Sequence, residues 1–251
     1  CGPLEIEALA DALEGLGPRE GTEAGLQHTW LSRWLQARDL AAAARERAFA
    51  TAPDGSSLWL HGLLARLLPP QSLLVLANSM AVRDVDSFIG SGPQPLSFLA
   101  NRGAAGIDGT LSTAVGAALH RSAAGQGPTF LLTGDLAFLH DINGLGLMGP
   151  DRRQSPDLTV VVLDDGGGAI FGYLPVAQQD PQTCSRFFRT DPDADLPAAC
   201  AAYRIPCQTA TGRAQFEQAW AWALDQPGIR VIVVKLDMAA NQAAHERYWG
   251  G

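Results

Sequence analysis

The chain has 251 residues, of which 47% are hydrophobic, so it can bury a substantial core as one large domain or one domain with an appendage. Its formal net charge is −8 at pH 7, and Lys235 is its only lysine. This acidic balance argues against a nucleic-acid surface, because phosphate backbones are bound by clusters of Lys and Arg.

The four cysteines suggest neither a disulfide framework nor a zinc site, because they show no Cys-x-x-Cys spacing and no histidine pair at zinc-binding distances. No apolar run reaches the length of about 18 residues that a membrane span needs, and the first residues lack the features of a signal peptide. We therefore expect a cytoplasmic protein without a membrane span. Because the first residue is Cys1, we expect the chain to be processed or to be part of something longer.

The first predicted element is a long helix over residues 22–50, a stretch rich in Ala, Arg and Leu that contains no proline. Trp30 and Trp34 recur in it at helical spacing, and we interpret them as core packing rather than as a platform for a cofactor. The turn Pro53-Asp54-Gly55 ends the helix.

After residue 55 the pattern alternates between helix and strand. The predicted helices cover residues 57–68, 110–123, 139–148 and 213–224, and the predicted strands cover residues 72–77, 96–100, 129–133, 158–163, 207–210 and 229–236. Strands that alternate with helices predict an α/β fold, in which a parallel sheet carries helices on both faces.

Two of these strands end in acidic residues and glycine. The strand over 129–133 runs into Gly134-Asp135, and the strand over 158–163 runs into Asp164-Asp165-Gly166-Gly167-Gly168. The carboxyl ends of parallel strands meet at one edge of the sheet, where ligands of open α/β sheets bind. Two carboxylates and a glycine carbonyl suit Mg²⁺, which usually keeps a bound phosphate as a partner. The sequence therefore predicts metal and phosphate binding at this edge.

Two further strands are followed by polar loops, at residues 78–83 and 101–109. We expect these loops to lie at the same edge as the two acidic turns. Together the four loops, with their aspartates and arginines, predict a site for an anionic ligand and a metal ion.

Four segments together resemble the C-terminal half of one family: Asn78–Asp84, Asn101–Gly109, Gly134–Asp141 and Asp164–Phe171. That family is the thiamine-diphosphate-dependent 2-succinyl-5-enolpyruvyl-6-hydroxy-3-cyclohexene-1-carboxylate synthases of menaquinone biosynthesis. The resemblance covers roughly residues 22–251, and the four motifs occur in the family's order. It implies the thiamine-diphosphate-binding fold, with residues 55–251 as the domain that binds diphosphate and metal. Residues 1–54 would then be the end of the family's middle domain and a linking helix.

The resemblance implies that Asp135, the side chain of Asp165 and the carbonyl of Gly167 hold Mg²⁺, or Mn²⁺ in its place, against the cofactor's diphosphate. The family's turn usually carries Asn where this chain has Asp164 and Asp165, which adds negative charge beside a diphosphate. We expect metal binding nonetheless.

Further contacts with thiamine diphosphate are implied for the loops around this turn. The resemblance assigns them to Gly106, Ile107, Gly134, Asp135, Leu136, Ile170, Phe171 and Leu174. Ile107 would be the apolar wedge that bends the cofactor so that its amino group reaches the thiazolium carbon, and Ile170, Phe171 and Leu174 would line its rings. Core packing is the alternative interpretation of these four apolar residues.

The family decarboxylates 2-oxoglutarate and adds the resulting succinyl unit to isochorismate. The resemblance implies that Ser79, Arg83 and Arg102 hold the carboxylates of these substrates, for which arginine forks are suited. The alternative is that the arginines are exposed and pair with Asp84 or Asp108.

The resemblance also implies what this chain lacks. The glutamate that activates the cofactor belongs to the family's N-terminal pyrimidine-binding domain, usually on a neighbouring subunit, and no part of this sequence resembles that domain. We interpret Glu217 and Glu246 as solvated surface residues and His140 as a supporting or structural residue.

We therefore expect an enzyme chain that holds no catalytic residue of its own and is inactive alone. It would need an N-terminal pyrimidine-binding domain or subunit, and the complete enzyme would be a homodimer or homotetramer. Two alternatives stay open: a noncatalytic partner or degenerate binding subunit, and another thiamine-diphosphate lyase of the acetolactate-synthase type.

Overall fold

The computed structural model describes residues 23–89, 95–147 and 156–250, with the side chains of residues 23–29 and 250 left out. The start of the chain, including Cys1, lies outside the described residues. The chain forms two compact units, residues 1–47 and 48–251. The predicted domain boundary after residue 54 stays a prediction. In the described ranges no helix is long and apolar enough to cross a bilayer.

The described part of the first unit is helical and belongs to α2 (Glu23–Thr51), close to the predicted range. Trp30 and Trp34 are 59% and 62% exposed, so their interpretation as core residues is wrong for the structure described. Their rings contact each other edge to face, with centroids 6.0 Å apart, because residues four positions apart lie on one helix face. The spacing of the two tryptophans therefore predicted correctly that they share one face of a helix, but that face is not buried.

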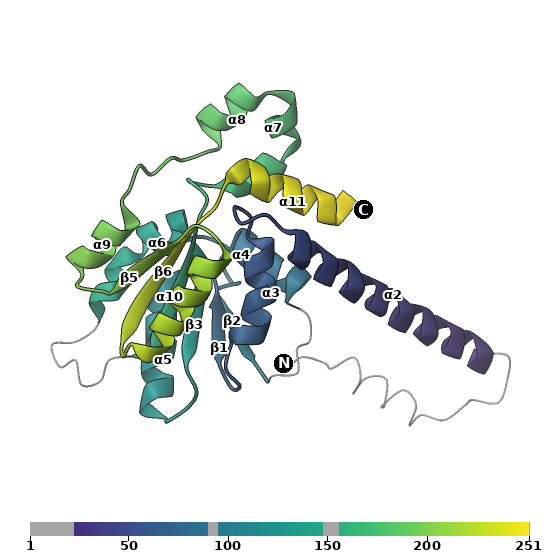
Figure 1. The fold of residues 1–251 in the computed structure, drawn as a ribbon, viewed down its shortest axis with the longest axis horizontal. Helices are drawn as coiled ribbons and strands as arrows, with labels where there is room; N and C mark the ends of the chain where they lie inside the picture. The colour runs from purple at the N-terminus through teal and green to yellow at the C-terminus, as the bar shows by residue number, and fades with distance from the viewer. Residues whose placement is uncertain (1–22, 90–94, 148–155, 251) are drawn as a thin grey trace. The chain divides into compact units, whose positions relative to one another are not determined.

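The second unit is built on one six-stranded sheet (Figure 1). Its strands are β1 (Leu73–Leu76), β2 (Ser97–Ala100), β3 (Thr129–Gly134), β4 (Leu158–Asp164), β5 (Cys207–Ala210) and β6 (Ile229–Lys235). They lie in the order β2-β1-β3-β4-β6-β5, and every neighbouring pair is parallel. The predicted parallel α/β fold is confirmed, and each strand agrees with its predicted range to within about one residue at either end.

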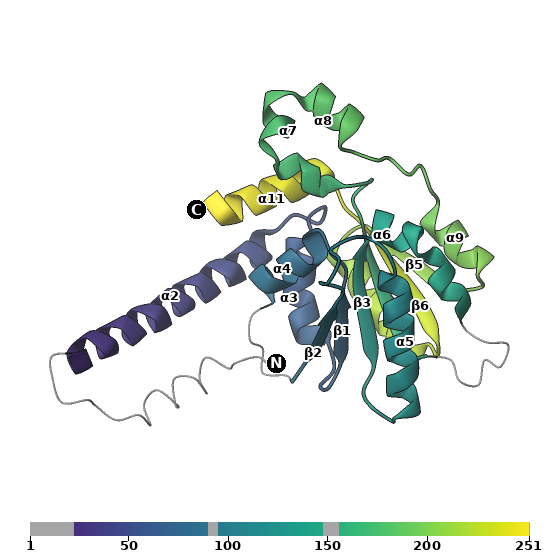
Figure 2. The same cartoon turned by 180° about the vertical axis from the view of Figure 1, so that it is seen from behind.

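Helices cover both faces of this sheet (Figures 1 and 2). One face carries α3 (Leu58–Leu67), α4 (Met80–Phe88) and α10 (Arg213–Asp225), and the other carries α5 (Thr110–Ala123), α6 (Asp135–His140) and α9 (Leu196–Ala202). Successive strand side chains point to opposite faces, so Leu74 and Leu76 pack with the first group while Leu73 and Val75 pack with the second. The central strand β4 is buried at every residue, because both of its faces are covered.

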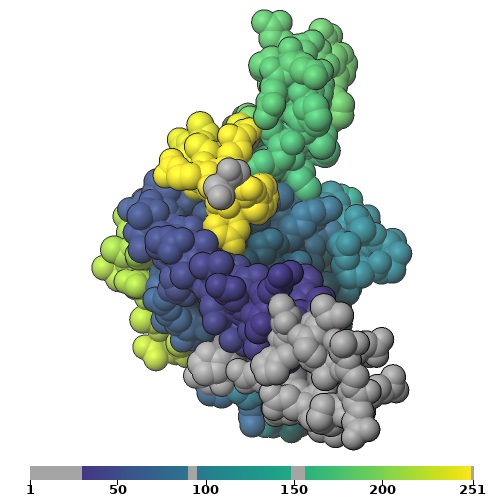
Figure 3. Space-filling view, turned by 90° about the vertical axis from the view of Figure 1, so that its right-hand side faces the viewer, coloured from purple at the N-terminus to yellow at the C-terminus, as the bar shows by residue number. Residues whose placement is uncertain are grey.

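The remaining elements lie beyond the carboxyl ends of the strands or connect them. They are the 3-10 helices η1 (Ile142–Leu147) and η3 (Ala169–Tyr173) and the α-helices α7 (Pro175–Gln179), α8 (Pro181–Phe187) and α11 (Met238–Gly250). The segment that contains α7 and α8 projects from the rest of this unit, as Figure 3 shows in green above α11.

The predicted helix over residues 139–148 is wrong. The α-helix α6 ends at His140 and the 3-10 helix η1 follows, while residue 148 lies outside the described residues. The carboxylate of Asp141 accepts hydrogen bonds from the backbone N and the Oγ of Ser112 in α5, at 2.7 and 2.8 Å. Gly144 lies so close to Ser112 that a Cβ on it would be 3.0 Å from that backbone nitrogen. Contact with α5 therefore breaks the helix at this point.

Candidate functional site

The topology places a crevice between β1 and β3. These strands are neighbours, but the chain leaves β1 through α4 on one face and leaves β3 through α6 on the other. In open α/β sheets such a reversal opens a crevice at the carboxyl ends of the strands, where ligands bind. Asn78 and Ser79 follow β1 at this point, and Asp135 follows β3.

The turn after β4 brings together the carboxylates that the sequence predicts as metal ligands. Asp135, only 3% exposed, accepts hydrogen bonds from the backbone N–H of Leu136 at 2.7 Å and of Gly167 at 2.8 Å. Asp165 accepts from the same Gly167 N–H at 3.0 Å and from that of Ala169 at 3.3 Å. The two side chains therefore converge on one backbone donor.

Gly167 is required at the centre of this turn. Its φ is +94°, in the region that favours glycine, and an added Cβ would lie 1.5 Å from the carbonyl oxygen of Thr190. Its own carbonyl accepts a long hydrogen bond from Thr190 N at 3.4 Å, which leaves one lone pair of that oxygen for another partner.

The electrostatics of the turn favour a cation. Burial, and next the charge of Asp165, raise the pKa of Asp135 to about 6. Burial also raises the pKa of Asp165, against the opposing effects of the Ala169 and Gly167 N–H groups and of Arg189. A divalent cation would relieve the repulsion between these buried carboxylates.

The donor set fits Mg²⁺ bound to a phosphate. In the part of the chain that the structure describes, no group of three or more His, Cys, Asp or Glu side chains could hold a metal ion. The turn offers two carboxylates and a backbone carbonyl, which are all oxygen donors, and Mg²⁺ usually completes its shell with phosphate and water.

The start of α4 forms a second part of the crevice. The sequence predicts a loop over residues 78–83, but α4 already begins at Met80, so this prediction is wrong for its second half. Ser79 has φ +67° and ψ −131°, a strained conformation for a residue with a side chain, and its hydroxyl does not cap the helix. Backbone N–H groups at such a helix start attract anions.

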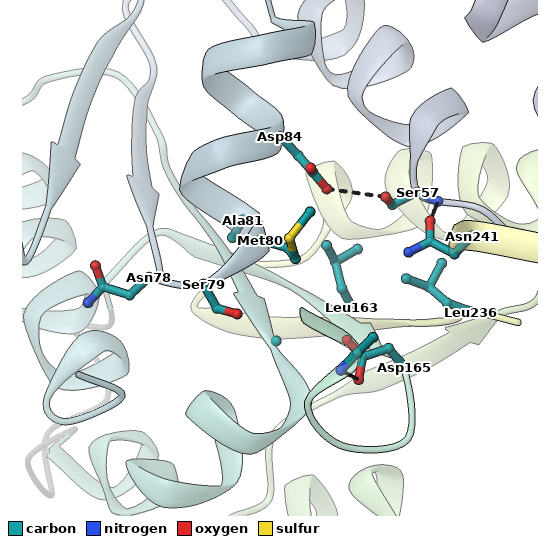
Figure 4. A pocket seen from close by; sticks show the side chains of 12 residues that line it. Ser57, Asn78, Ser79, Met80, Ala81, Asp84, Leu163, Asp165, Leu236 and Asn241 are labelled. Atoms are coloured by element: carbon teal, nitrogen blue, oxygen red, sulfur yellow. Dashed lines mark hydrogen bonds between the residues drawn. The ribbon is translucent and has the colours of Figure 1, made fainter. Parts of the chain in front are cut away.

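A pocket joins the two parts, as Figure 4 shows. Its lining comes from the ends of β3 and β4, the starts of α3 and α4, and residues at or near α11. These residues are Ser57, Asn78, Ser79, Met80, Ala81, Asp84, Gly134, Leu163, Asp165, Ala169, Leu236 and Asn241.

The two arginines predicted to bind substrate are tied to the loop after β1. Arg83 donates to the carbonyl of Ser79 at 2.6 Å, and Arg102 donates to the side-chain oxygen of Asn78. The alternative, in which these arginines pair with Asp84 or Asp108, is not found among the described contacts. Asp84 pairs instead with the buried His245, and Asp108 lies 3.7 Å from His140.

The apolar residues predicted to contact the cofactor rings lie outside the buried core, but they are not among the residues that line the pocket. Ile107 and Leu174 are exposed, and Ile170 and Phe171 are half-buried, so none of the four packs as a fully buried core residue. Gly106 accepts a hydrogen bond from Asn78 at 2.7 Å, which fixes the loop that carries Ile107.

A buried polar network in the wall of the pocket, which includes the lining residues Ser57, Asp84 and Asn241, was missed by the sequence reasoning. Asp84 accepts from Ser57 Oγ at 3.3 Å and pairs with His245 Nε2 at 3.1 Å, while His245 Nδ1 lies 2.8 Å from the carbonyl of Asn241. Both ring nitrogens of His245 therefore have a hydrogen-bond partner, and which of them donates depends on the tautomer. The four-residue spacing of Asn241 and His245 is helical, but no local signal relates them to Asp84.

Three comparisons show which known proteins this chain is similar to. Residues 83–234 match the family described as thiamine pyrophosphate enzyme, C-terminal TPP binding domain. The 2-succinyl-5-enolpyruvyl-6-hydroxy-3-cyclohexene-1-carboxylate synthase of Mycobacterium avium is 40% identical over 92% of this chain and 42% of its own length. The synthase of that name from Listeria monocytogenes is 35% identical over 96% of this chain and 39% of its own. The chain thus spans about two fifths of these curated relatives.

Among solved structures, benzoylformate decarboxylase from Polynucleobacter necessarius matches with a TM-score of 0.60. It covers 71% of this chain and 32% of its own, at 23% identity, which is evidence for the fold alone. The family resemblance that was inferred from the four sequence motifs is confirmed by the family match and by the curated relatives.

Proposed function

The chain belongs to the thiamine pyrophosphate enzymes, whose C-terminal TPP-binding domain it contains, and on this premise we propose that it supplies the diphosphate and metal half of a synthase active site. The proposed reaction is decarboxylation of 2-oxoglutarate with transfer of the succinyl semialdehyde unit to isochorismate, in menaquinone biosynthesis. The 35 to 40% identity to synthases of this name over most of the chain favours this activity over that of other thiamine enzymes.

The observation that carries the proposal is the convergence of Asp135 and Asp165 on the N–H of Gly167, at 2.8 and 3.0 Å. We propose that these carboxylates and the Gly167 carbonyl hold Mg²⁺, against which the diphosphate binds. The helix start at Ser79 and Met80 would face the same anion. When bound, thiamine diphosphate supplies the nucleophilic carbon and the electron sink for decarboxylation.

The protein's contribution is orientation and the exclusion of water. Ile107, Ile170, Phe171 and Leu174 are not fully buried, and we propose that they line the cofactor rings. Ser79 offers a hydroxyl that makes no cap hydrogen bond.

The proposed substrates carry carboxylates that need cationic partners. Arg83 and Arg102 are held beside the crevice by the Ser79 carbonyl and the Asn78 side chain, and they retain further donors for a carboxylate. We propose that these two arginines select dicarboxylic 2-oxo acids.

The activating glutamate is proposed to come from an N-terminal pyrimidine-binding domain on a partner segment or subunit. Within this chain Glu217 and Glu246 are both exposed, and Glu246 accepts a hydrogen bond from Gln242 at 2.9 Å. Neither is a candidate for that role.

Calorimetric titration of the chain with thiamine diphosphate tests the proposal. We expect binding in the presence of Mg²⁺ and its loss when EDTA removes the metal. Binding that does not depend on a divalent cation would contradict the metal assignment, and no binding under either condition would contradict the proposed function.

A further inference from the structure

We propose that Arg189 is a positioning residue of the metal turn, which holds the backbone of Gly166 and offsets the charge of Asp165 so that a metal and diphosphate can bind. The inference rests on the proposed function, because it concerns the same turn. It adds a residue from the segment after α8, more than twenty positions beyond the turn itself.

The contacts place Arg189 directly against the turn. Its guanidinium donates to the carbonyl of Gly166 at 3.0 Å, and a Cβ on Gly166 would lie 3.7 Å from the same guanidinium nitrogen. The next residue, Thr190, packs so closely on Gly167 that no side chain fits between them. The segment at 189–190 therefore forms one wall of the turn.

The charges at this place explain why a cation is needed. Asp135 and Asp165 accept from the same Gly167 N–H, Asp164 is the preceding residue of the chain, and an incoming diphosphate would add further negative charge. Asp164 is paired with Lys235, the only lysine of the chain, which leaves Asp165 to be offset by another group. The guanidinium of Arg189, which is bonded to the carbonyl of the next residue Gly166, is a cation that this segment brings beside Asp165.

Hydrogen bonding alone does not account for this placement. The Nε of Arg189 is buried and has no partner among the described residues, so the side chain leaves one donor unsatisfied. An unpaired buried donor is unfavourable, and a side chain selected for structural hydrogen bonds would avoid it. The hydrogen bond to Gly166 and the charge of the guanidinium are the two gains that can offset this cost.

The test is a double-mutant cycle of Arg189→Met and Asp165→Asn with two readouts. In calorimetry with saturating Mg²⁺, we expect Arg189→Met to weaken thiamine diphosphate binding about tenfold when Asp165 is present, as for other residues that support metal ligands. With Asp165→Asn already in place, we expect a loss of less than about threefold, since the charge to be offset is gone. Arg186→Met is the matched control, because Arg186 lies over the ring of Phe187 and not at the turn.

The second readout needs no cofactor. In urea unfolding of the chain alone, Arg189→Met should raise the unfolding equilibrium constant about fivefold more with Asp165 present than in the Asp165→Asn background. Equal effects in the two backgrounds, or an effect no larger than that of Arg186→Met, would overturn the proposal. If the unmodified chain bound no cofactor, the proposed function would be wrong, and the unfolding cycle alone would decide the role of Arg189.

Discussion

Two buried aspartates at the carboxyl edge of the sheet have opposite surroundings. Asp84 is 1% exposed, and each of its oxygens has a side-chain donor, from His245 and from Ser57. Asp135 is 3% exposed, but its hydrogen bonds come only from backbone N–H groups, and the charges of Asp165 and Asp164 raise its pKa. Burial alone does not reveal a ligand site. The difference in partners does, because the first group is complete without a ligand and the second is not.

The largest effect is expected at the completed group. Asp84→Ala should lower the free energy of unfolding by about 3 to 5 kcal/mol, because it leaves the buried His245 without its carboxylate. Urea denaturation measures this. Asp86→Ala, an exposed position on the same helix, serves as the control. If both variants unfolded at the same urea concentration, the network would not be the structural element that we describe.

At Asp135, whose surroundings are incomplete without a ligand, substitution should affect cofactor binding. Substitution of a residue that only supports a metal ligand typically weakens metal affinity about 10- to 100-fold. Loss of the proposed ligand itself, in Asp135→Ala, should therefore weaken Mg²⁺-dependent cofactor binding by more than about 100-fold. Asp165→Asn should bind as well as the unmodified chain or better, because it removes one of the repelling charges. Unchanged cofactor affinity in Asp135→Ala, measured by calorimetry, would end the metal assignment.

Arg83 and Arg102 test whether the edge also selects substrate. In an assembled enzyme, Arg83→Ala and Arg102→Ala should each lower kcat/KM for 2-oxoglutarate by about 10- to 100-fold, the worth of one charge-assisted hydrogen bond. Turnover of pyruvate, which lacks the second carboxylate, should suffer less. Equal losses of kcat/KM for the two substrates would show that the arginines only support the Asn78–Ser79 loop and do not select the substrate.

The smallest expected effect is on the pH dependence of stability. It involves His61, which contacts the carbonyl of Ser57, a member of the Asp84 network. Burial, against the charge of Asp84, lowers the pKa of His61 below its ordinary value of 6.5. Its Nδ1 faces the Ser57 carbonyl at 2.7 Å and its Nε2 has no described partner, so protonation would bury an unpaired N–H. The unfolded chain then binds more protons, and stability should fall as pH drops below 6.5.

Urea midpoints at several pH values check this shift in His61→Gln and in the exposed control His120→Asn. The fall in stability below pH 6.5 should be smaller in the His61 variant and unchanged in the control. An identical pH profile for His61→Gln and the unmodified chain would contradict the assignment.

The sheet and the meeting of two acidic turns at its carboxyl edge were predictable because their signals are local. Buried strands give unbroken apolar runs, and the acidic and glycine residues that follow β3 and β4 mark the edge without knowledge of the packing. Helices α7 and α8 also had local signals that were overlooked. Each begins with proline, and Asp180 caps α8 by accepting from Thr183 N at 3.0 Å.

Other features depend on contacts that no local pattern encodes. Asp84 meets His245 across 161 positions, and Arg189 reaches Gly166 from a separate segment. The break after His140 results from packing against α5. The exposure of Trp30 shows that helical spacing of apolar residues does not tell which surface, if any, covers them. Tertiary contacts decide these cases, and the sequence pattern does not.

The most direct test of the central claim is release of CO₂ from 2-oxoglutarate with Mg²⁺ and thiamine diphosphate. The purified chain alone should show none, since we propose that the activating glutamate comes from an N-terminal pyrimidine-binding domain, and activity should appear when an N-terminal half of a related synthase is added. Robust decarboxylation by the chain alone would contradict the account, as would a mixture that stays inactive although the chain binds cofactor.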